Sequence, residues 1–526
     1  MNSMRMNREG LQPWRLKPVV GAALTALALT GCSLAPKYER PAAPVATQWP
    51  ASAGAVTASQ AAAADLAWQD FVTDPQLREL IGKALHNNRD LRMAIQSIEQ
   101  ARAQYQITRA NQLPTVGLSG SGTRQRPGST YALGGPLVAD SYSLGVGISD
   151  WEIDFFGRLQ SLKDAALAQY LATEEARKAA QISLVANIAS TWLTLKTDTD
   201  LLVLAERTML TRKQSFDLTK LRFDNGVSSA LDMRQAESLL STAEAARAAQ
   251  TRARALDINL LTLLVGEPIP DTLIPAVPTV EPLPASGDLT QANAAPTLPD
   301  NRAQFLPIPE GLPSDLLIRR PDIRQAEQQL IAANANIGAA RAAFFPRISL
   351  TASLGRISSD FEGLFGGGSS GLKSWSFGPT ISLPIFDGGR NRANLEVSQA
   401  TRDIAVSSYE KAIQTAFREV ADALASRSAL ADQAAALQRQ ADAERDRFRL
   451  ADLRYRNGVA NYLDMLDAQR SLFATEQELA QVQLARQQNE VLLYKALGGG
   501  WGPQDEAAAR EAAGQPVSRE ATANAR

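Results

Sequence analysis

The amino-acid sequence repeats itself over a long interval. The stretch "LRFDNGVSSALDM" begins at Leu221 and "LRYRNGVANYLDM" begins at Leu453, an offset of 232 residues (453 − 221 = 232). The same offset relates Pro114 to Pro346. We therefore expect an internal duplication. A period this long is too large for a stacked solenoid, so the two copies predict a pseudo-two-fold object in which one architecture is built twice.

The duplication and the composition divide the chain into expected segments. The stretch between the copies holds too many prolines for a continuous helix or a central strand. In order, we expect a signal peptide over residues 1–31, a tether over 32–74, a first repeat over 75–265, a Pro-rich linker over 266–306, a second repeat over 307–497 and a tail over 498–526.

The N-terminus predicts where the protein goes. Basic residues precede the short apolar run "PVVGAALTALALTGC", which has the layout of a secretory signal and ends at Cys32. This ending resembles the bacterial lipoprotein signal, which implies that Cys32 carries a covalent lipid. The following Ser33 implies release to the outer membrane. Cys32 is the only cysteine, so a monomer has no disulfide, and the alternative is that Cys32 is an ordinary small buried side chain.

Each repeat carries two segments in which apolar and small polar residues alternate. In the first copy the apolar side chains are Tyr142, Leu144, Val146 and Ile148, and in the second copy Trp375, Phe377 and Ile381 share a face. The pattern fits a half-buried soluble strand or a membrane barrel strand, and lengths of about ten residues favour the latter. After Cys32 no apolar run is long enough for a membrane helix, so a membrane-spanning mature chain would use strands.

The two copies differ by one residue beyond these segments. Ile148 lies 10 positions before Arg158, whereas Ile381 lies 9 positions before Arg390. We therefore expect a β-bulge in one strand, compensated in the preceding loop.

Very long helices are expected after the strands. Residues 158–224 and 390–457 contain no proline, and each stretch could extend on the order of 100 Å as a helix. Heptad-like apolar spacing, as at Leu184, Ile188, Trp192 and Leu195, predicts packing along the helix length. Asn-Gly pairs at 225–226 and 457–458 supply the left-handed conformations that end a helix, so each copy should finish in a helical hairpin turn.

These residues together carry a family resemblance. The duplicated strands and helices, "FDGGR", "LRYRNGVANYLDMLDAQRSLF", Cys32 and the closing "LYKALGGGW" resemble the TolC-like outer membrane factors, in the lipoprotein branch associated with multidrug efflux. The resemblance implies an α+β membrane protein that forms, as a homotrimer, a shared transmembrane β-barrel continuous with a long periplasmic α-helical barrel. Barrel arithmetic agrees, because membrane barrels start at about eight strands and one chain supplies four.

The implied function is a passive exit duct for drugs or other small molecules. The implied partners are a periplasmic adaptor (a membrane fusion protein), an inner-membrane efflux pump of the RND type, and outer-membrane lipid. Lys+Arg 54 against Asp+Glu 55 gives no net charge to attract nucleic acid. No cofactor or metal is expected beyond the lipid on Cys32.

Three other functions remain open. An enzyme is disfavoured because His86 is the single histidine and the carboxylates are scattered along helices without a catalytic constellation. A type I secretion channel for polypeptides is an alternative within the same fold, although "YKALGGGW" favours efflux. A lipoprotein scaffold without a pore would explain the helices but not the alternating strands.

Charged residues near the turns are candidates for a periplasmic gate. Asp217 and Arg449 occupy matched positions about two helical turns before their hairpins, and Asp446 and Asp452 lie within one turn of Arg449. The resembling channels carry an aspartate ring near this level, and arginine in the second copy departs from that pattern. The alternative is that all four residues are ordinary solvated helix charges.

The turns themselves are candidates for adaptor docking. Three chains with two turns each would present six loops, in which Asn225-Gly226-Val227 alternates with Asn457-Gly458-Val459. Glycine beside valine lets a partner helix approach closely. The alternative is that each glycine only terminates its helix.

Overall fold

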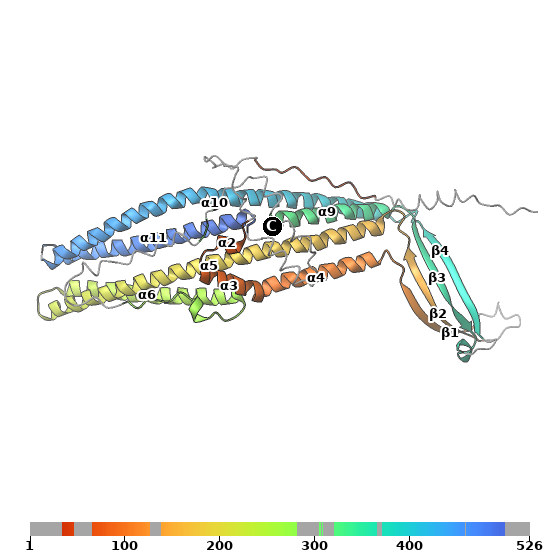
Figure 1. Ribbon diagram of the computed structural model, residues 1–526, viewed down its shortest axis with the longest axis horizontal. Helices are drawn as coiled ribbons and strands as arrows, with labels where there is room; N and C mark the ends of the chain where they lie inside the picture. Colours follow the sequence, from red (N-terminus) through yellow and green to blue (C-terminus); the bar gives the residue numbers. More distant parts are fainter. Residues whose placement is uncertain are drawn as a thin grey trace, which may run out of the picture. The chain divides into compact units, whose positions relative to one another are not determined.

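The computed structural model describes residues 34–46, 66–126, 138–280, 305–306, 308, 320–365, 371–457 and 459–499. Over these residues the chain forms long α-helices and an antiparallel sheet (Figure 1). The helices are α2 (Trp68–Phe71), α3 (Pro75–Asn87), α4 (Arg89–Ala110), α5 (Arg158–Asp224), α6 (Ala230–Val265), α9 (Pro321–Ala342), α10 (Arg390–Arg456) and α11 (Tyr462–Ala496), with short 3-10 helices η3 (Asp271–Leu273) and η4 (Glu362–Leu364). The strands are β1 (Val116–Gln125), β2 (Ala139–Glu152), β3 (Arg347–Ser358) and β4 (Gly371–Ser382).

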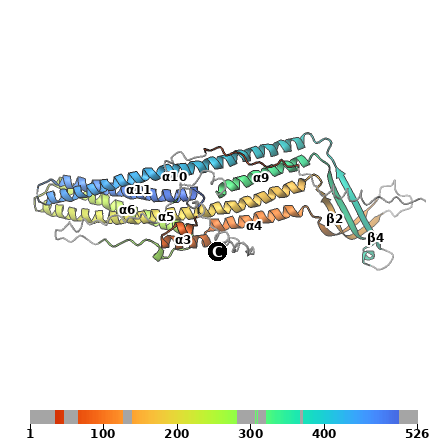
Figure 2. The same ribbon diagram turned by 45° about the horizontal axis from the view of Figure 1, so that its top comes forward.

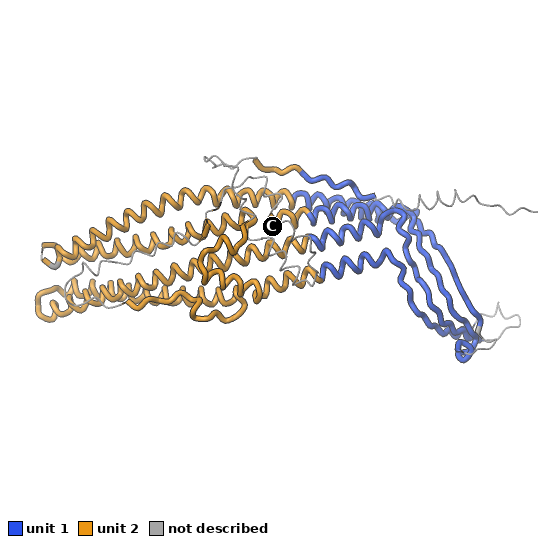
Figure 3. Tube along the Cα trace, viewed as in Figure 1, with its two compact units in different colours: residues 1–41, 100–171, 328–407 blue, residues 42–99, 172–327, 408–526 orange. Residues whose placement is uncertain are grey.

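The chain divides into two compact units that do not follow the two sequence repeats (Figure 3). Unit 1 takes its residues from 1–41, 100–171 and 328–407, and unit 2 from 42–99, 172–327 and 408–526. Each unit contains parts of both copies, because corresponding elements of the two copies pack together rather than each copy folding by itself.

All four strands belong to unit 1 and form one sheet in the order β1-β2-β3-β4, with antiparallel neighbours throughout. The β2–β3 ladder joins the first copy to the second. β1 and β4 are the two edge strands of this sheet.

The sheet has an apolar face and a polar face. Across the strands, Leu118 lies opposite Val146, Val146 opposite Leu354, and Leu354 opposite Trp375, so apolar side chains form a continuous row. All four of these side chains are well exposed to the surroundings. The other face carries hydroxyl pairs, with Ser121 and Ser143 at 2.8 Å and Ser353 and Ser376 at 2.7 Å between their Oγ atoms. The predicted alternation is therefore confirmed on both copies.

The predicted bulge is also confirmed. The β2–β3 register shifts between Ile148, which lies opposite Ala352, and Trp151, which lies opposite Leu350. Asp150 within this interval has a positive φ of 49°, which accommodates the extra residue.

The helical part of unit 1 is packed through alanine. Ala165 and Ala168 of α5 contact Ala332 and Ala335 of α9, all of them buried. Small side chains at these positions allow the helix backbones to approach closely.

Two helical hairpins dominate unit 2, one made by α5 and α6 and the other by α10 and α11 (Figure 2). The predicted apolar stripe on α5, from Leu184 to Leu195, is buried, with Trp192 among the largest fully buried side chains. The helix ends also agree with the sequence, because α5 ends at Asp224 and α10 at Arg456, directly before the two Asn-Gly pairs.

Part of the expected tether is packed against the protein. In unit 2, Phe71 of α2 stacks between Phe305 and Tyr494, with ring centroids 4.8 and 3.9 Å away. In unit 1, residues 34–36 lie against α9, where the Asn334 amide donates to the Pro36 carbonyl (2.7 Å) and the Arg341 guanidinium to the Leu34 carbonyl (3.2 Å). A Cβ on Gly338 would lie 2.8 Å from Ala35, so glycine provides the space for this segment.

Candidate functional site

The turn between α5 and α6 is closed by backbone hydrogen bonds around Gly226. The Val227 N–H donates to the Arg222 carbonyl (2.8 Å) and the Gly226 N–H to the Phe223 carbonyl (2.9 Å). Gly226 has φ 74°, a left-handed conformation that favours glycine, and this pattern is the Schellman helix end. Ser229 then starts α6 through a capping box with Asp232, and the Ser229 hydroxyl lowers the pKa of the Asp232 carboxyl.

The second turn uses the same chemistry in its described residues. The Val459 N–H donates to the Arg454 carbonyl (2.9 Å), which matches the Val227 bond. The side-chain amide of Asn457 donates to the Leu453 carbonyl (2.7 Å), as that of Asn225 does to Leu221 (2.7 Å). Gly458 lies outside the described residues.

Both turns expose the same set of apolar side chains. The valine after each glycine is well exposed, 77% for Val227 and 68% for Val459. Leucines before and after the valine are exposed too, at matched positions in the two copies: Leu221 and Leu231 in the first, Leu453 and Leu463 in the second. Exposed leucine and valine side chains grouped at a helix end, twice in one chain, indicate a surface that a partner covers.

A polar contact ties the two hairpins together just above the turns. Arg222 of α5 donates to the Tyr455 hydroxyl of α10 (2.6 Å) and lies over its ring, 5.4 Å from the centroid. The Tyr455 ring in turn contacts Tyr462, at 5.3 Å between centroids. Burial raises the pKa of the Tyr462 phenol, whose hydroxyl is hydrogen-bonded to Thr219. Both hairpins are thus held at a fixed separation at this level.

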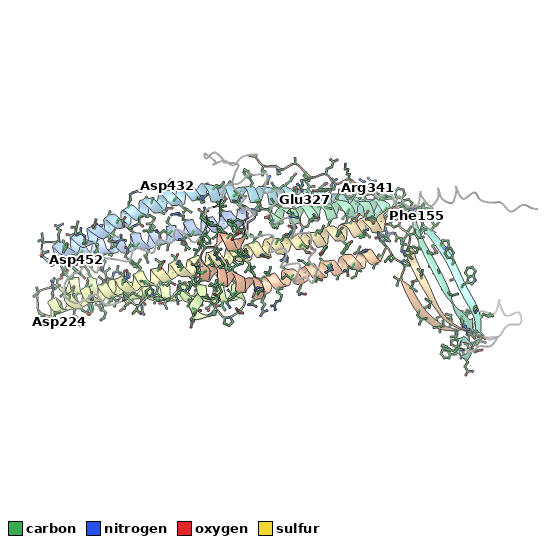
Figure 4. All side chains as sticks on the ribbon, in the orientation of Figure 1. Phe155, Asp224, Glu327, Arg341, Asp432 and Asp452 are labelled. Carbon is green, nitrogen blue, oxygen red and sulfur yellow. The ribbon has the colours of Figure 1, made fainter. Side chains whose placement is uncertain are left out.

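The structure gives each of the four gate candidates a definite setting. Asp217 pairs with Lys213 one turn away (3.5 Å), and Arg449 pairs with Asp446 (3.3 Å), both on exposed helix surface. Asp452 is buried, and Figure 4 labels it on α10 near the turn. Within one chain, Asp217 and Arg449 each have a partner on their own helix. The Asp446–Arg449 grouping seen in the sequence is therefore a real ion pair, whereas Asp452 does not share its solvated setting.

A large groove lies beside the second turn. It has a volume of about 1060 Å³ and is formed by α6, α10 and α11 of unit 2. Asp446 and Leu463 line it, together with Arg447, which pairs with Asp467 (2.6 Å). The hydrogen bond that the Arg447 guanidinium donates to the Asp467 carboxylate raises the pKa of Arg447.

The candidate lipidation site, Cys32, lies outside the described residues. The described chain starts two positions later, at Leu34, whose carbonyl is bound by Arg341. Arg341 lies near the end of α9 and six positions before β3.

The sequence matches the outer membrane efflux protein family over residues 80–267 and 312–499. The chain belongs to this family. The two matched segments start 232 residues apart (312 − 80 = 232), which is the offset of the internal duplication.

Individual members of the family are similar to this efflux protein over nearly its whole length. The toluene efflux pump outer membrane protein TtgI of Pseudomonas putida is 46% identical over 479 residues, covering 90% of this chain and 97% of TtgI. Outer membrane protein OprJ of Pseudomonas aeruginosa is 46% identical over 490 residues, covering 92% of this chain and 97% of OprJ. The open-state crystal structure of the MtrE outer membrane channel of Neisseria gonorrhoeae is similar, with 39% identity and a TM-score of 0.74, covering 90% of this chain and 99% of MtrE.

This efflux protein is therefore the outer-membrane channel component of a tripartite efflux system, located in the outer membrane and extending into the periplasm. Members of the family form trimers and work with an adaptor and an inner-membrane pump, and its relatives are efflux channels rather than enzymes. In the described part of the chain, no helix is long and apolar enough to cross a membrane.

Sequence reasoning missed several residues of this site. The leucines at 221, 231, 453 and 463 recur at the duplication offset, and comparing the two copies position by position would have found them. The Arg222–Tyr455 contact has a weaker signal, because Tyr455 replaces the Phe223 of the first copy and so adds a hydroxyl on one side only.

Proposed function

We propose that three copies of the chain share one transmembrane β-barrel, continuous with a periplasmic helical barrel, and that this assembly is a passive exit duct. Support comes from the sheet, whose apolar face suits lipid and whose hydroxyl-lined face suits water. Four strands cannot close a barrel, and sharing between chains removes both edges. The cargo is drugs or other small molecules, in keeping with the toluene and antibiotic pumps named among the relatives.

The adaptor docks on the turns at Asn225-Gly226-Val227 and Asn457-Gly458-Val459, and passes cargo from an inner-membrane pump of the RND type. The single observation that carries this proposal is the matched exposed set of Val227 and Val459 with their flanking leucines. Ending a helix requires the glycine, but it does not require the valine and the two leucines that each copy exposes.

The test is Gly226→Leu, with Gly389→Leu as its matched control. Both glycines have positive φ, 74° and 89°, and neither has an atom within 4 Å of an added Cβ. Each substitution therefore costs about 1–2 kcal/mol of backbone strain and little else. We expect both variants to form trimers in the outer membrane, but only Gly226→Leu, and likewise Gly458→Leu, to lose efflux and adaptor crosslinking. Full efflux and undiminished crosslinking in the two turn variants would refute docking there.

Cys32 carries the lipid that anchors the N-terminus in the outer membrane. The contacts of residues 34–36 with α9 support this, because they hold the chain just after Cys32 close to the start of β3. Cys32→Ser should be unlabelled by radioactive fatty acid and remain unprocessed. Normal lipid labelling of this variant would remove Cys32 from the proposal.

Single-channel conductance separates the duct from the remaining alternatives. Reconstituted trimers should conduct ions, whereas a scaffold without a pore should not. Export of a polypeptide by a strain that lacks small-molecule efflux would instead favour a secretion channel.

A further inference from the structure

We propose that β4 of one protomer pairs antiparallel with β1 of a second copy in the register that the internal duplication dictates, with Thr380 opposite Ser121. The inference rests on the shared barrel proposed above and deepens it, because it names the residues that meet at the seam between chains.

The β2–β3 ladder inside one chain is the template for this seam. We call the first strand of each copy (β1 or β3) its entry strand and the second (β2 or β4) its exit strand. In this ladder the exit strand of the first copy, β2, pairs with the entry strand of the second, β3, and Gly147 lies opposite Ser353. In a closed ring of copies, the exit strand of the second copy, β4, must meet the entry strand of a first copy, β1. Because β1 and β4 are opposite edges of the same sheet, that first copy belongs to another chain.

The hairpin registers fix how template positions translate. Val116 lies opposite Ile148, and its equivalent Ile348 lies opposite Ile381. Entry strands thus correspond at an offset of 232 (348 − 116) and exit strands at 233 (381 − 148). Gly147 therefore corresponds to Thr380, whose hydroxyl side chain occupies the glycine position of the template.

The same translation turns the template partner, Ser353, into Ser121. The template pair of Ile148 with Ala352 likewise becomes Ile381 opposite Gly120.

This register puts like faces together. Ile381 and Gly120 both lie on the apolar face, whereas Thr380 and Ser121 both lie on the hydroxyl face. A slip of one residue would place every apolar side chain of β4 beside the polar face of β1, so only even slips compete. The pairing also continues past the strand ends. Beyond the β2 bulge the exit strands correspond at an offset of 232, because the extra residue has been passed. The Ile153 N–H donates to the Ile348 carbonyl in the template (2.9 Å), which therefore translates to Ile385 donating to Val116 of the second copy.

The joint just beyond the strands shows what the second copy covers. Ile385 and Phe386 are 96% and 91% exposed in the single chain. On the other edge, Leu113 and Val116 are also exposed. Apolar side chains are thus left bare on both edges at the same level, as expected for two surfaces that cover each other.

The joint within the chain has a different chemistry. There Glu152 accepts two hydrogen bonds from Arg158 (2.8 and 2.6 Å) and pairs with Arg347 (2.8 Å). The position equivalent to Glu152 is Pro384, and that equivalent to Arg347 is Thr115. The seam between chains therefore has no counterpart of the Glu152–Arg347 ion pair. The seam between subunits is therefore closed by apolar contact, while the seam within the chain is closed by charge.

Cysteine crosslinking tests the register directly, since Cys32 is the only native cysteine. The test variant is Ser121→Cys with Thr380→Cys. Directly opposed residues have Cα atoms about 5 Å apart, within disulfide reach. The matched controls are Ser119→Cys and Thr123→Cys, each combined with Thr380→Cys. These lie on the same face but two positions away, which puts their Cα atoms about 8 Å from Thr380 and out of reach.

Outer membranes are oxidised with copper phenanthroline and run on denaturing gels without reductant. We expect the test variant to give reducible covalent trimers, and the controls to stay monomeric. A third variant, Ser353→Cys with Ser376→Cys, should oxidise within one chain and lose thiol labelling, which shows that the oxidant reaches this face.

Preferential crosslinking of either control pair overturns the register while leaving the shared barrel intact. If no pair with Thr380→Cys crosslinks while the third variant is oxidised, β4 does not meet β1 of another chain, and the shared barrel fails as well.

Discussion

Replacing Asp257 by asparagine should stabilise the folded protein at neutral and alkaline pH. Asp257 of α6 is hydrogen-bonded to Asp198 of α5, and its buried Oδ2 has no hydrogen-bond partner among the described residues. The nearby Arg254 guanidinium is engaged elsewhere, with the Thr199 hydroxyl (3.2 Å) and the Pro275 carbonyl (2.8 Å). Burial, and then the charge of Asp198, raise the pKa of Asp257 to about 7.

The direction of the pH dependence follows from this raised pKa. The folded state holds the proton more tightly than the unfolded state, where the pKa has its ordinary value of 3.8. The stabilisation from the protonated carboxyl is fully present below that value and is lost as the pH rises through about 7. Above about pH 7, both carboxyl groups of the folded state are charged and lie next to each other, whereas the unfolded chain separates them.

The interval from 3.8 to about 7 sets an upper limit of roughly 4 kcal/mol on the cost. Both carboxyl groups are partly exposed, so solvent screens their repulsion and we expect about 1–2 kcal/mol. Asparagine keeps the shape and a hydrogen bond without the charge. The variant should therefore exceed the parent by about 1–2 kcal/mol at about pH 8, and the difference should disappear as the pH falls below 3.8.

The assay is denaturant unfolding of the detergent-purified protein, followed by helical circular dichroism at several pH values. Asp432→Asn is the control, because Asp432 is an exposed carboxylate on α10 (Figure 4). It should leave the pH profile of the parent unchanged. If Asp257→Asn is no more stable than the parent at about pH 8, the Asp198–Asp257 pair is not a destabilising one.

Three further predictions concern the buried Arg320, the aromatic stack around Phe71 and the gate candidates. Arg320 is buried and binds the Glu419 carboxylate (2.9 Å), so Arg320→Met should lower the unfolding free energy by about 2–3 kcal/mol, measured by the same denaturation. Phe71→Ala removes a fully buried ring from its stack and should cost about 3–5 kcal/mol, with earlier proteolysis of the N-terminal segment. Asp217→Ala and Arg449→Ala should raise single-channel conductance if these charges constrict the channel, and unchanged conductance and ion selectivity in both would exclude them from the gate.

Much of the fold was predictable because its signals are local. The Asn-Gly pairs at 225–226 and 457–458 end helices through backbone conformation alone, so α5 and α10 finish where expected. The alternation around Val146 and Phe377 needed only strand periodicity, and one extra residue before Arg158 was enough to predict the bulge. These features depend on neighbouring residues in the chain, which the sequence displays directly.

The remaining features depend on residues far apart in sequence. Nothing near Asp257 in the sequence shows that Asp198 faces it, since the two residues come from opposite arms of a hairpin. The proline- and alanine-rich stretch after Cys32 suggested a tether, and its contacts with Asn334 and Arg341 depend on the space left by Gly338. For the gate candidates, the partners of Asp217 and Arg449 are local, whereas the burial of Asp452 depends on its surroundings in the folded protein and has no signal in the sequence.

In the shared barrel proposed above, the paired hydroxyls of the sheet bear on how long a solute stays in the channel. Ser121 with Ser143 and Ser353 with Ser376 belong to a face otherwise built largely of glycine, serine and threonine. A passing molecule meets many weak, similar hydrogen-bonding groups there, and each exchanges readily with water. Such a wall has no deep energy minimum, so cargo of varied chemistry should move along it by short steps without being retained. Residence time in this part of the channel should then depend on the size of the cargo far more than on its functional groups.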